Sequence, residues 1–534
     1  MAGVKPPAAS GFASSRAGIK GLVIAVLSER WPLSARQLHS AIREDFSSSA
    51  SYQGVHKALE TLLGEGIVLF KDRKYQLDPG WIRELKLAGE TLERKYAGMA
   101  EPLSYISAGT GVSFDSNPAV AGRKAAEAAL KALAKPPDFA FVFCHGGTFA
   151  KNDGGMVEFA QAVDGVLRKK NSVCKWVGCT TDGEISDKGC FFNSCSVLAL
   201  ASEHVSFGVG VGDNASKNFF AAGKQAAASA TEDLKSIDPY VERYMRFLAV
   251  KRKQPCEFLK TKPYLLLTIF PGPTKSYAPN EEELLKGIQN ITGLTPLFGG
   301  SASDSAVFSQ TYQFANGKAY KDACIALAVL SDLKMAFSVR HGLKPTKKQA
   351  LVTKSKGNRV FTLAGKPAAK VYAKMLGLSM PQLRKKLFDV VVQKPFGITD
   401  PLGHYWLKTP FHINPDFSLN FLNSVPQNAL LVLMDSDGES ILDSTRNVLR
   451  DVKEKLSPDI SVMLLFDCGS RPRALRLGNR LPSAEFEVFK KELPNSKIIG
   501  FYTHGEQALI PSGTIGQHNH TIVAIGISGE LIGE

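Results

Sequence analysis

The sequence predicts an α/β (mixed α+β) protein in which a small helical domain precedes two related α/β halves with mixed sheets. Two observations support this fold class. Apolar strand-like runs alternate with helix-like segments over most of the chain, and a short polar phrase that follows such a run occurs twice. With 534 residues the chain is too long for a single hydrophobic core, so several domains are expected.

The first eighty residues have a pattern of their own. Apolar residues recur at helical spacing over 17–29, Pro32 ends that helix, and Ser34 caps a second helix that runs to residue 43. A third helix over 51–63 is followed by two short strands around a charged turn within 67–77. Three helices followed by a hairpin resemble a winged helix-turn-helix, which we place at 17–80.

The flanks of this domain lack such a pattern. Residues 1–16 are rich in Ala, Ser and Pro without an apolar core, so we expect a disordered tail and no signal peptide. Residues 81–102 are expected to form a helical connector.

The rest of the chain alternates strands and helices. Strands are predicted at 139–144, 173–179, 196–200, 205–211, 264–270, 312–314, 325–329, 429–434, 460–466, 497–502 and 521–527. Helices are predicted at 119–134, 156–169, 215–234, 281–290, 368–376, 441–455 and 483–492.

The repeated phrase points to a ligand site. It reads Val-Gly-Cys-Thr-Thr-Asp-Gly-Glu at 177–184 and Ile-Gly-Phe-Tyr-Thr-His-Gly-Glu at 499–506. Each copy follows a strand, a helix and a second strand, so its polar end lies where βαβ units place ligands. The chain therefore carries two related units, each presenting a polar turn.

These phrases also carry a family resemblance. Residues 177–185 and the Leu-Phe-Gly-Gly-Ser-Ala-Ser-Asp run at 297–304 resemble the N-terminal half of the FIST sensory domain. The motifs at 466–471, 500–506 and 518–521 resemble its C-terminal half. We place the two halves at 103–345 and 346–534. The resemblance implies an intracellular small-molecule sensor in signal transduction, with amino acids as proposed ligands; some members bind haem.

Residues of these motifs suit a zwitterionic ligand. The Arg471 guanidinium can hold a carboxylate, and Glu506 or Glu184 can receive an ammonium group. An alternative is that Arg471 and Glu506 form a structural ion pair. The predicted ligand-binding residues are Arg471, Tyr502, Thr503, Glu506, Asn519, Thr181 and Glu184.

The N-terminal domain carries polar residues that suit DNA. Side chains of the third helix would reach base edges, and cations of the hairpin would hold phosphates. The predicted DNA-binding residues are Tyr52, Gln53, His56, Lys57, Lys71, Arg73 and Lys74. Winged helices also dock proteins, so an alternative is a signalling adaptor with a protein partner.

Other features bound the function. No apolar run is long enough to span a membrane, and the low density of cysteines indicates reduced thiols, so a cytoplasmic protein is expected.

The spacing of Cys174, Cys179, Cys190 and Cys195 permits zinc, but an odd separation on a strand points side chains to opposite faces, so no metal or other cofactor is predicted. No P-loop and no nucleophile elbow occur, so the chain is not expected to be an enzyme, although one that uses the polar turns stays an alternative.

The charge is unevenly distributed. The net charge is +15, which favours anionic partners. Residues 333–388 contain no Asp or Glu while Lys and Arg recur throughout. A solvated basic surface is one interpretation of this stretch, and contact with nucleic acid or an acidic partner is the other.

Overall fold

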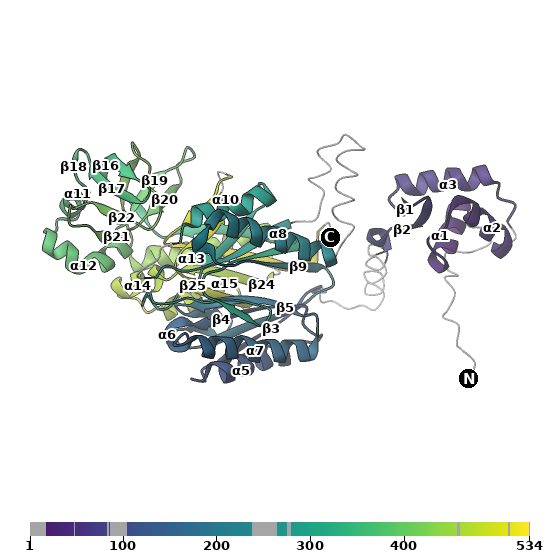
Figure 1. Cartoon of the computed structure of the whole chain (residues 1–534), viewed down its shortest axis with the longest axis horizontal. Helices are drawn as coiled ribbons and strands as arrows, with labels where there is room; N and C mark the ends of the chain where they lie inside the picture. The colour runs from purple at the N-terminus through teal and green to yellow at the C-terminus, as the bar shows by residue number, and fades with distance from the viewer. Residues whose placement is uncertain are drawn as a thin grey trace. The chain divides into compact units, whose positions relative to one another are not determined.

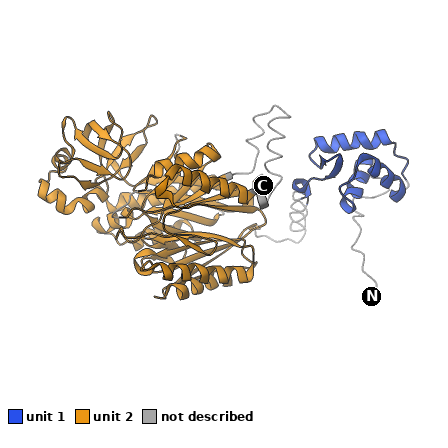
Figure 2. Ribbon diagram, viewed as in Figure 1, with its two compact units in different colours: residues 1–102 blue, residues 103–534 orange. Residues whose placement is uncertain are grey.

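The computed structural model describes residues 18–46, 48–82, 85, 104–237, 264–274, 279–456, 460–510 and 513–532. The chain divides into two compact units, Met1–Pro102 and Leu103–Glu534 (Figure 2). The expected tail at 1–16 and nearly all of the expected connector at 81–102 lie outside the described residues. Within those residues, no helix combines the length and the apolar character needed to cross a bilayer.

The first unit contains three helices and a hairpin, in the predicted order. The helices are α1 (Ile19–Glu29), α2 (Ala35–Phe46) and α3 (Tyr52–Gly64), and the strands are β1 (Val68–Lys71) and β2 (Lys74–Leu77). Ser51 begins α3, because its Oγ accepts a hydrogen bond from the Gly54 N–H at 3.1 Å. The apolar faces meet in a core that includes Val23, Leu38 and Leu59.

The second unit contains three copies of one arrangement of elements. In each copy a first strand is followed by a helix, a second strand, a helix, a third strand, a hairpin and a last strand. We call the copies repeat 1 (residues 107–201), repeat 2 (205–331) and repeat 3 (333–531). Sequence reasoning found the first and the third of these but not the second.

Repeat 1 consists of β3 (Ser107–Ser113), α5 (Pro118–Lys131), β4 (Phe139–His145), the short α6 (Gly146–Phe149), α7 (Asp153–Lys170), β5 (Lys175–Thr181), the hairpin β6 (Glu184–Ser186) and β7 (Gly189–Phe191), and β8 (Cys195–Ala201). Repeat 2 consists of β9 (Val205–Gly212), α8 (Phe219–Ile237), β10 (Tyr264–Phe270), α10 (Glu281–Thr292), β11 (Leu297–Ser301), the hairpin β12 (Gln313–Ala315) and β13 (Lys318–Tyr320), and β14 (Cys324–Ser331).

Repeat 3 consists of β15 (Leu333–His341), α13 (Gly438–Leu456), β24 (Ile460–Cys468), α14 (Ser470–Leu477), α15 (Ser483–Glu492), β25 (Lys497–Thr503), the hairpin β26 (Glu506–Leu509) and β27 (Ile515–His518), and β28 (Thr521–Leu531). Helices of the repeats cover the outer faces of the sheets, with α5 and α7 over one sheet and α8 and α10 over another (Figure 1).

The repeats exchange their hairpins in a closed ring. Each forms a mixed six-stranded sheet from four strands of its own and a hairpin borrowed from another repeat. The hairpin of repeat 1 pairs with β25 of repeat 3, that of repeat 3 with β11 of repeat 2, and that of repeat 2 with β5 of repeat 1. The turn that follows each third strand therefore crosses from one repeat to the next.

Close packing explains the glycines of the first strands. A Cβ on Gly111 of β3 would lie 1.9 Å from the Ala125 carbonyl oxygen, and one on Gly210 of β9 would lie 2.0 Å from that of Ala226. The glycines let α5 and α8 approach their strands closely. The Gly-Val-Gly-Val-Gly run at 208–212 is thus a packing surface for α8.

Repeat 3 carries an insertion between its first strand and its first helix. This inserted subdomain, residues 344–435, contains β16 (Lys344–Lys356), β17 (Arg359–Leu363), β18 (Lys366–Pro367), α11 (Ala368–Leu376), α12 (Met380–Gln393), β19 (Phe396–Thr399), β20 (Tyr405–Lys408), β21 (Pro410–Ile413), β22 (Leu419–Phe421) and β23 (Leu430–Asp435). It has a sheet and a hydrophobic core of its own. It contains most of the acid-free basic stretch, in which sequence reasoning predicted α11 but not β16 or α12.

Candidate functional site

The two Thr-x-Gly-Glu turns have the same internal structure. The Thr181 hydroxyl donates to Glu184 Oε1, and the Thr503 hydroxyl donates to Glu506 Oε1. The second oxygen of Glu184 accepts from the Ser194 N–H and hydroxyl at 3.2 and 2.5 Å. That of Glu506 accepts from the Thr521 N–H and hydroxyl at 3.2 and 2.7 Å. Each glutamate therefore ties its turn to the last strand of its own repeat.

Both carboxyl groups are fully buried. Burial raises the pKa of Glu184 to about 8 and that of Glu506 to about 7, although the hydrogen bonds from Ser194 and Thr181, or from Thr503 and Thr521, oppose the rise. Every carboxyl oxygen already has a partner within the chain.

Repeat 2 has a glutamine at the corresponding position. Gln313 Oε1 accepts from the Ala323 N–H at 3.0 Å, directly before the last strand of the repeat, and its Nε2 donates to Thr311 Oγ1 at 3.3 Å. The neutral amide of Gln313 thus links its turn to the start of the last strand, as the two glutamates do in their repeats. This third copy has no Thr-x-Gly-Glu phrase to reveal it.

Arg471 belongs to a separate buried network. Its Nε lies 2.5 Å from Asp467 and its Nη2 lies 2.8 Å from Glu485, and all three side chains are inaccessible to solvent. Nη1 and Nη2 also donate to Ser444 and Thr445. Arg471 thus pairs with Asp467 and Glu485, so the alternative of a structural ion pair between Arg471 and Glu506 is wrong.

Tyr502 extends this network, and Asn519 lies outside it. The Tyr502 hydroxyl donates to Glu485 Oε2 at 3.3 Å. Asn519 sits in the turn between β27 and β28, where its Nδ2 donates to the His518 carbonyl oxygen and its Oδ1 is buried without a partner. The predicted ligand residues thus lie in three buried groups, Arg471 with Tyr502, Thr503 with Glu506, and Thr181 with Glu184, with Asn519 outside them. Their ligand role stays a prediction.

The turns after the three third strands and the end of β4 contribute to a partly exposed cluster, which we call the polar junction: His145, Asp182, Ser305 and His504. Asp182 Oδ2 lies 2.9 Å from His504 Nε2, and Asp182 Oδ1 accepts from the Ser305 N–H at 2.5 Å. The Ser305 hydroxyl lies 2.7 Å from His145 Nε2. One carboxylate of repeat 1 therefore contacts groups from both of the other repeats.

The tautomer of His145 follows from its neighbours. Its Nδ1 accepts from the Thr148 N–H at 3.2 Å, which places the ring proton on Nε2. Burial lowers the pKa of His145, although Asp182 opposes the shift, so the ring is neutral. The His145 Nε2–H and the Gly147 N–H, at 3.2 Å, both donate to Ser305 Oγ. The hydroxyl proton of Ser305 is therefore left to donate elsewhere.

His504, unlike His145, has a pKa above its ordinary value. Burial alone would lower its pKa, but the contact with Asp182 outweighs that effect, and the pKa is raised. Its Nδ1 is buried without a hydrogen-bond partner, and the ring of Phe308 stacks on the imidazole with centroids 5.1 Å apart.

Strain marks the loop that supplies Ser305. Ser305, Ala306 and Phe308 all have left-handed φ angles, between 56° and 64°, although none is glycine. Asp304 holds the loop by accepting from the Phe308 and Ser309 N–H groups. Such strain is concentrated at functional sites, and sequence reasoning, which singled out 297–304, stopped one residue short of it.

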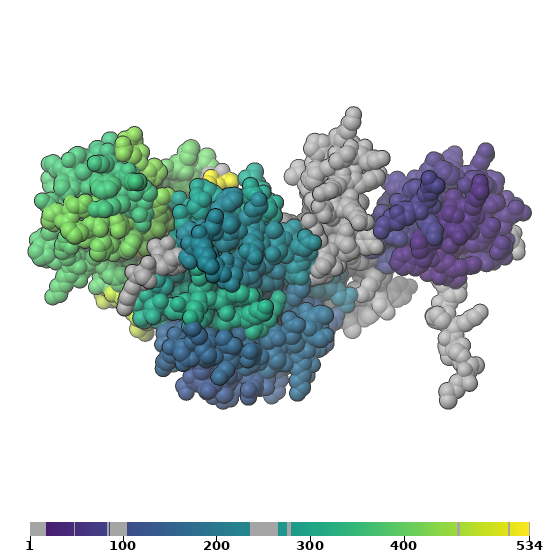
Figure 3. Space-filling model, in the orientation of Figure 1, coloured from purple at the N-terminus to yellow at the C-terminus, as the bar shows by residue number. Residues whose placement is uncertain are grey.

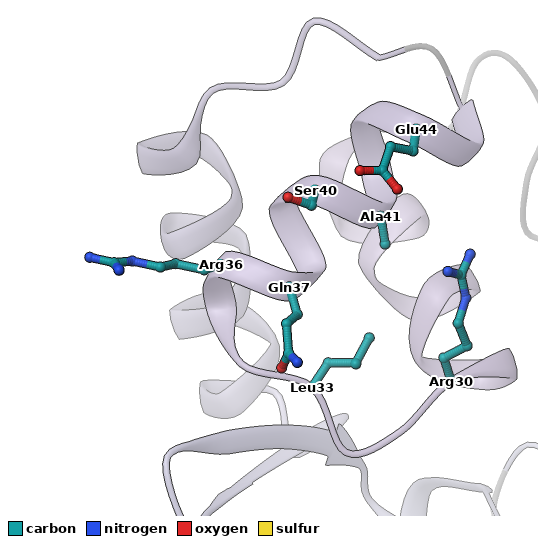
Figure 4. Close-up of a pocket in the computed structure, with 7 residues that line it drawn as sticks. All are labelled: Arg30, Leu33, Arg36, Gln37, Ser40, Ala41 and Glu44. Carbon is teal, nitrogen blue, oxygen red and sulfur yellow. The ribbon is translucent and has the colours of Figure 1, made fainter.

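The seven predicted DNA-binding residues of the first unit are all exposed. Tyr52, Gln53, His56 and Lys57 lie on α3, and Lys71, Arg73 and Lys74 lie in the hairpin, where Asp72 and Arg73 adopt left-handed φ angles. Figure 4 shows a hollow of about 310 Å³ on the same unit, lined by Arg30, Leu33, Arg36, Gln37, Ser40, Ala41 and Glu44. None of the predicted DNA-binding residues lines this hollow.

Within the described part of the chain, no group of three or more His, Cys, Asp or Glu side chains could hold a metal ion. Cys174 and Cys179 are buried thiols, and the pKa of Cys174 is raised to about 12 by burial.

Comparisons with known proteins give a family for most of the second unit. A FIST N domain matches residues 138–366, and a FIST C domain matches residues 368–509. An uncharacterized protein of Methanocaldococcus jannaschii is 28% identical over 239 residues, which make up 41% of this chain and 43% of that protein. The match thus spans less than half of the relative.

Among solved structures, cyanuric acid hydrolase from A. caulinodans aligns with a TM-score of 0.22 and 10% identity. The alignment covers 42% of this chain and 71% of that one. A likeness at this level carries no conclusion about function.

Proposed function

Because the chain contains a FIST N domain followed by a FIST C domain, we propose that it is a small-molecule sensor whose first unit binds double-stranded DNA. FIST domains indicate a sensor in signal transduction. The finer proposal has two parts, a ligand site in the second unit and a nucleic-acid surface on the first. Each part rests on different residues and is tested separately.

The ligand site is the polar junction. The observation that carries this proposal is the Ser305 hydroxyl, which accepts two hydrogen bonds within the chain and keeps its proton for an external acceptor. That proton suits a carboxylate, and Asp182 beside it suits an ammonium group. An amino-acid-like molecule carries both. The Thr181–Glu184 and Thr503–Glu506 turns, with Arg471, Tyr502 and Asn519, form the buried layer that positions these groups.

The junction is also suited to signalling because a carboxylate of repeat 1 contacts groups from the other two repeats there. A ligand that displaces one contact changes how the three turns are joined. Binding is thereby coupled to the arrangement of the repeats.

The test is a thermal-shift and calorimetric screen of the full chain against the twenty amino acids and their deaminated analogues. A ligand that binds only the folded state raises the melting temperature. Ser305→Ala should then weaken binding by about 10- to 150-fold, the loss of one hydrogen bond to a charged group. Ser309→Ala, an exposed serine of the same loop, is the matched control. Normal affinity in Ser305→Ala would exclude the junction.

The DNA proposal rests on the exposed polar face of α3 and the cations of the hairpin. A second candidate, a protein-docking adaptor, is favoured by two exposed aromatic side chains of this unit: Trp31 is 56% exposed and Phe70 is 52% exposed. Binding of duplex DNA with a steep salt dependence separates the two candidates.

We do not propose catalysis at the junction. A serine nucleophile needs a base that can accept its proton, but the Nε2 of His145 carries a proton of its own. The pair is therefore arranged for binding, and turnover of any screened compound would contradict this interpretation.

A further inference from the structure

We propose that the inserted subdomain binds single-stranded nucleic acid through a basic and aromatic surface. The proposal concerns residues that take part neither in the polar junction nor in the first unit. It therefore stands or falls independently of the proposed function.

The first step is the concentration of charge. Residues 344–435 contain fourteen Lys and Arg against four Asp, a net charge of +10, while the whole chain has +15. All four acids are engaged: Asp389 with Arg473, Asp400 with His404, Asp416 with Arg359, and Asp435 with Lys394.

Arg359 and Lys394 take part in two of these pairs, and of the other twelve cations all but the buried Lys408 are exposed. In the described part of the chain, none of eleven exposed cations pairs with a carboxylate: Lys344, Lys347, Lys348, Lys354, Lys356, Lys366, Lys370, Lys374, Arg384, Lys385 and Lys386. An uncompensated field of this density favours a polyanion.

The second step is the placement of aromatic rings among these cations. Lys370 of α11 and Arg384 of α12 lie over the ring of Phe417, at 4.6 and 5.7 Å from its centroid. Arg359 and Lys354 lie over the ring of Phe361, at 4.8 and 5.5 Å. Phe361 thus lies against two cations of the β16–β17 hairpin, and Phe417 lies against one cation from each of two helices.

The two groups form one surface. Arg359, beside Phe361, pairs at 2.8 Å with Asp416, the neighbour of Phe417. Phe417 has a left-handed φ of 64°, and the Ala369 N–H donates to its carbonyl oxygen, so the backbone that presents the ring is held in place. Lys374 lies one turn beyond Lys370 on α11, and Lys385 adjoins Arg384 on α12. The subdomain lies at one end of the second unit (Figures 1 and 3).

The third step is the choice of partner. Cations alone suit any polyanion, but rings among them suit a chain that alternates phosphates with unpaired bases. A duplex keeps its base faces stacked and offers none to Phe361. Exposed Phe411, 44% accessible, and Phe388, 48% accessible, add rings to the same subdomain. Single-stranded DNA or RNA therefore fits better than a duplex or an acidic protein.

The position of the insertion supports a separate role. The connection from first strand to first helix is short in repeat 1, from Ser113 to Pro118, and in repeat 2, from Gly212 to Phe219. Two repeats therefore complete their fold without an insertion. The subdomain, with a core of its own, is an addition to the repeat.

The experiment measures anisotropy of fluorescein-labelled dT20 and rU20, and of a 20-base-pair duplex, with the full chain. The test variant is Lys366→Glu, Lys374→Glu, Lys385→Glu and Lys386→Glu together, four exposed cations without ion pairs. It should weaken single-strand binding at least thirtyfold. It should also reduce the slope of log K against log salt by about 3. The control carries Lys131→Glu, Lys169→Glu, Lys170→Glu and Lys224→Glu, on α5, α7 and α8. It changes the net charge of the chain by the same amount as the test variant.

Two further variants separate the contributions. Phe361→Ala should weaken single-strand binding about 5- to 100-fold without changing the salt slope, because it removes stacking and no charge. In a background that carries Arg73→Ala and Lys74→Ala, which removes two hairpin cations of the first unit, the four-lysine variant should weaken single-strand binding by the same factor. Circular dichroism of each variant reports whether it is folded.

Four outcomes would overturn the proposal. Equal weakening in the control variant would show that net charge alone binds the oligonucleotide. Unchanged single-strand affinity in Phe361→Ala would leave only phosphate contacts. Loss of single-strand binding in the Arg73 and Lys74 variant would place the site in the first unit. Binding of polyglutamate or phosphatidylserine vesicles without oligonucleotide binding would assign the surface to an acidic protein or a membrane.

Discussion

His504 Nε2 lies 2.9 Å from Asp182 Oδ2 and joins turns that are 322 positions apart in the sequence. Each residue directly follows the threonine that ends the third strand of its repeat. In repeat 2 the corresponding position is Ser303, whose hydroxyl donates to the Tyr502 carbonyl oxygen at 2.8 Å, and the N–H of Ser305, two positions later, donates to Asp182. Asp182 is thus the point at which the three repeats are joined by polar contacts.

The Asp182–His504 contact predicts a pH-dependent stability. Because the folded pKa of His504 is raised above 6.5, the contribution of the pair is complete below that value and is lost as the pH rises through the folded pKa. We expect Asp182→Asn to lower the free energy of unfolding by about 1–3 kcal/mol at pH 6 and by less at pH 9. Chemical unfolding of both proteins from pH 6 to 9 measures this difference, and a constant difference would contradict the assignment.

We expect the Glu184→Gln variant to fold and its free energy of unfolding to depend less on pH. A carboxyl whose folded pKa is raised to about 8 binds more protons when folded, so its contribution falls as the pH rises from 4.5 towards 8. Over this window the wild-type chain loses up to about 1.4 kcal/mol of unfolding free energy per pH unit through Glu184. Glutamine does not titrate, so the variant avoids this loss. Gln313 shows that an amide fits such a turn, because it accepts from Ala323 and donates to Thr311.

The control for this prediction is Glu184→Ala. It removes the bonds from Thr181 and Ser194 and leaves those buried groups unpaired, so it should destabilise the chain at every pH. Equal stability of the two variants would mean that the tie made by Glu184 contributes nothing to folding.

Sequence reasoning found the elements more readily than their partners. Local pattern located most strands and the two Thr-x-Gly-Glu turns, because alternation and turn residues are local signals. The hairpin exchange was out of reach, because Glu184 of repeat 1 pairs with Phe501 of repeat 3, a contact that no nearby residue specifies. The second repeat was missed because Gln313 stands where the others have Glu and lies twelve positions after Ser301.

The candidate site was predicted in part, for a similar reason. The turns at 181–184 and 503–506 were singled out correctly as polar strand ends, but spacing cannot tell a buried tie from an accessible group. Arg471 was expected to bind a ligand carboxylate together with Glu506, whereas it lies in the first turn of α14 against Asp467 and Glu485. Ser305 and His145 come from different repeats, so only the folded chain brings them together.

Arg471 is expected to matter for folding. Arg471→Gln leaves Asp467 and Glu485 buried without their cation, which should cost about 3–5 kcal/mol of unfolding free energy. Arg473→Gln, two positions away on the same helix, removes an exposed pair with Asp389 and should cost about 0–1 kcal/mol. Urea unfolding compares the two. A stable Arg471→Gln variant that loses ligand would return Arg471 to the binding site.

The hairpin of the first unit gives the last prediction. Lys71, Arg73 and Lys74 are exposed around a turn in which Asp72 and Arg73 both have left-handed φ angles, the geometry of a tight two-residue hairpin. Such a turn projects its cations away from the core, where they can neutralise phosphates.

Replacing Arg73 and Lys74 with Ala should weaken binding to all duplex sequences and reduce the slope of log K against log salt by about 2, one unit for each lost phosphate contact. Lys20→Ala, which removes an exposed cation paired with Glu65 on the same unit, should leave the slope unchanged. Fluorescence anisotropy with a labelled duplex between 50 and about 200 mM salt measures the slope. An unchanged slope in the double variant would remove the hairpin from the interface. No duplex binding by the wild-type chain at the lowest salt would favour the adaptor, because exposed Trp31 and Phe70 would then be the strongest docking features of this unit.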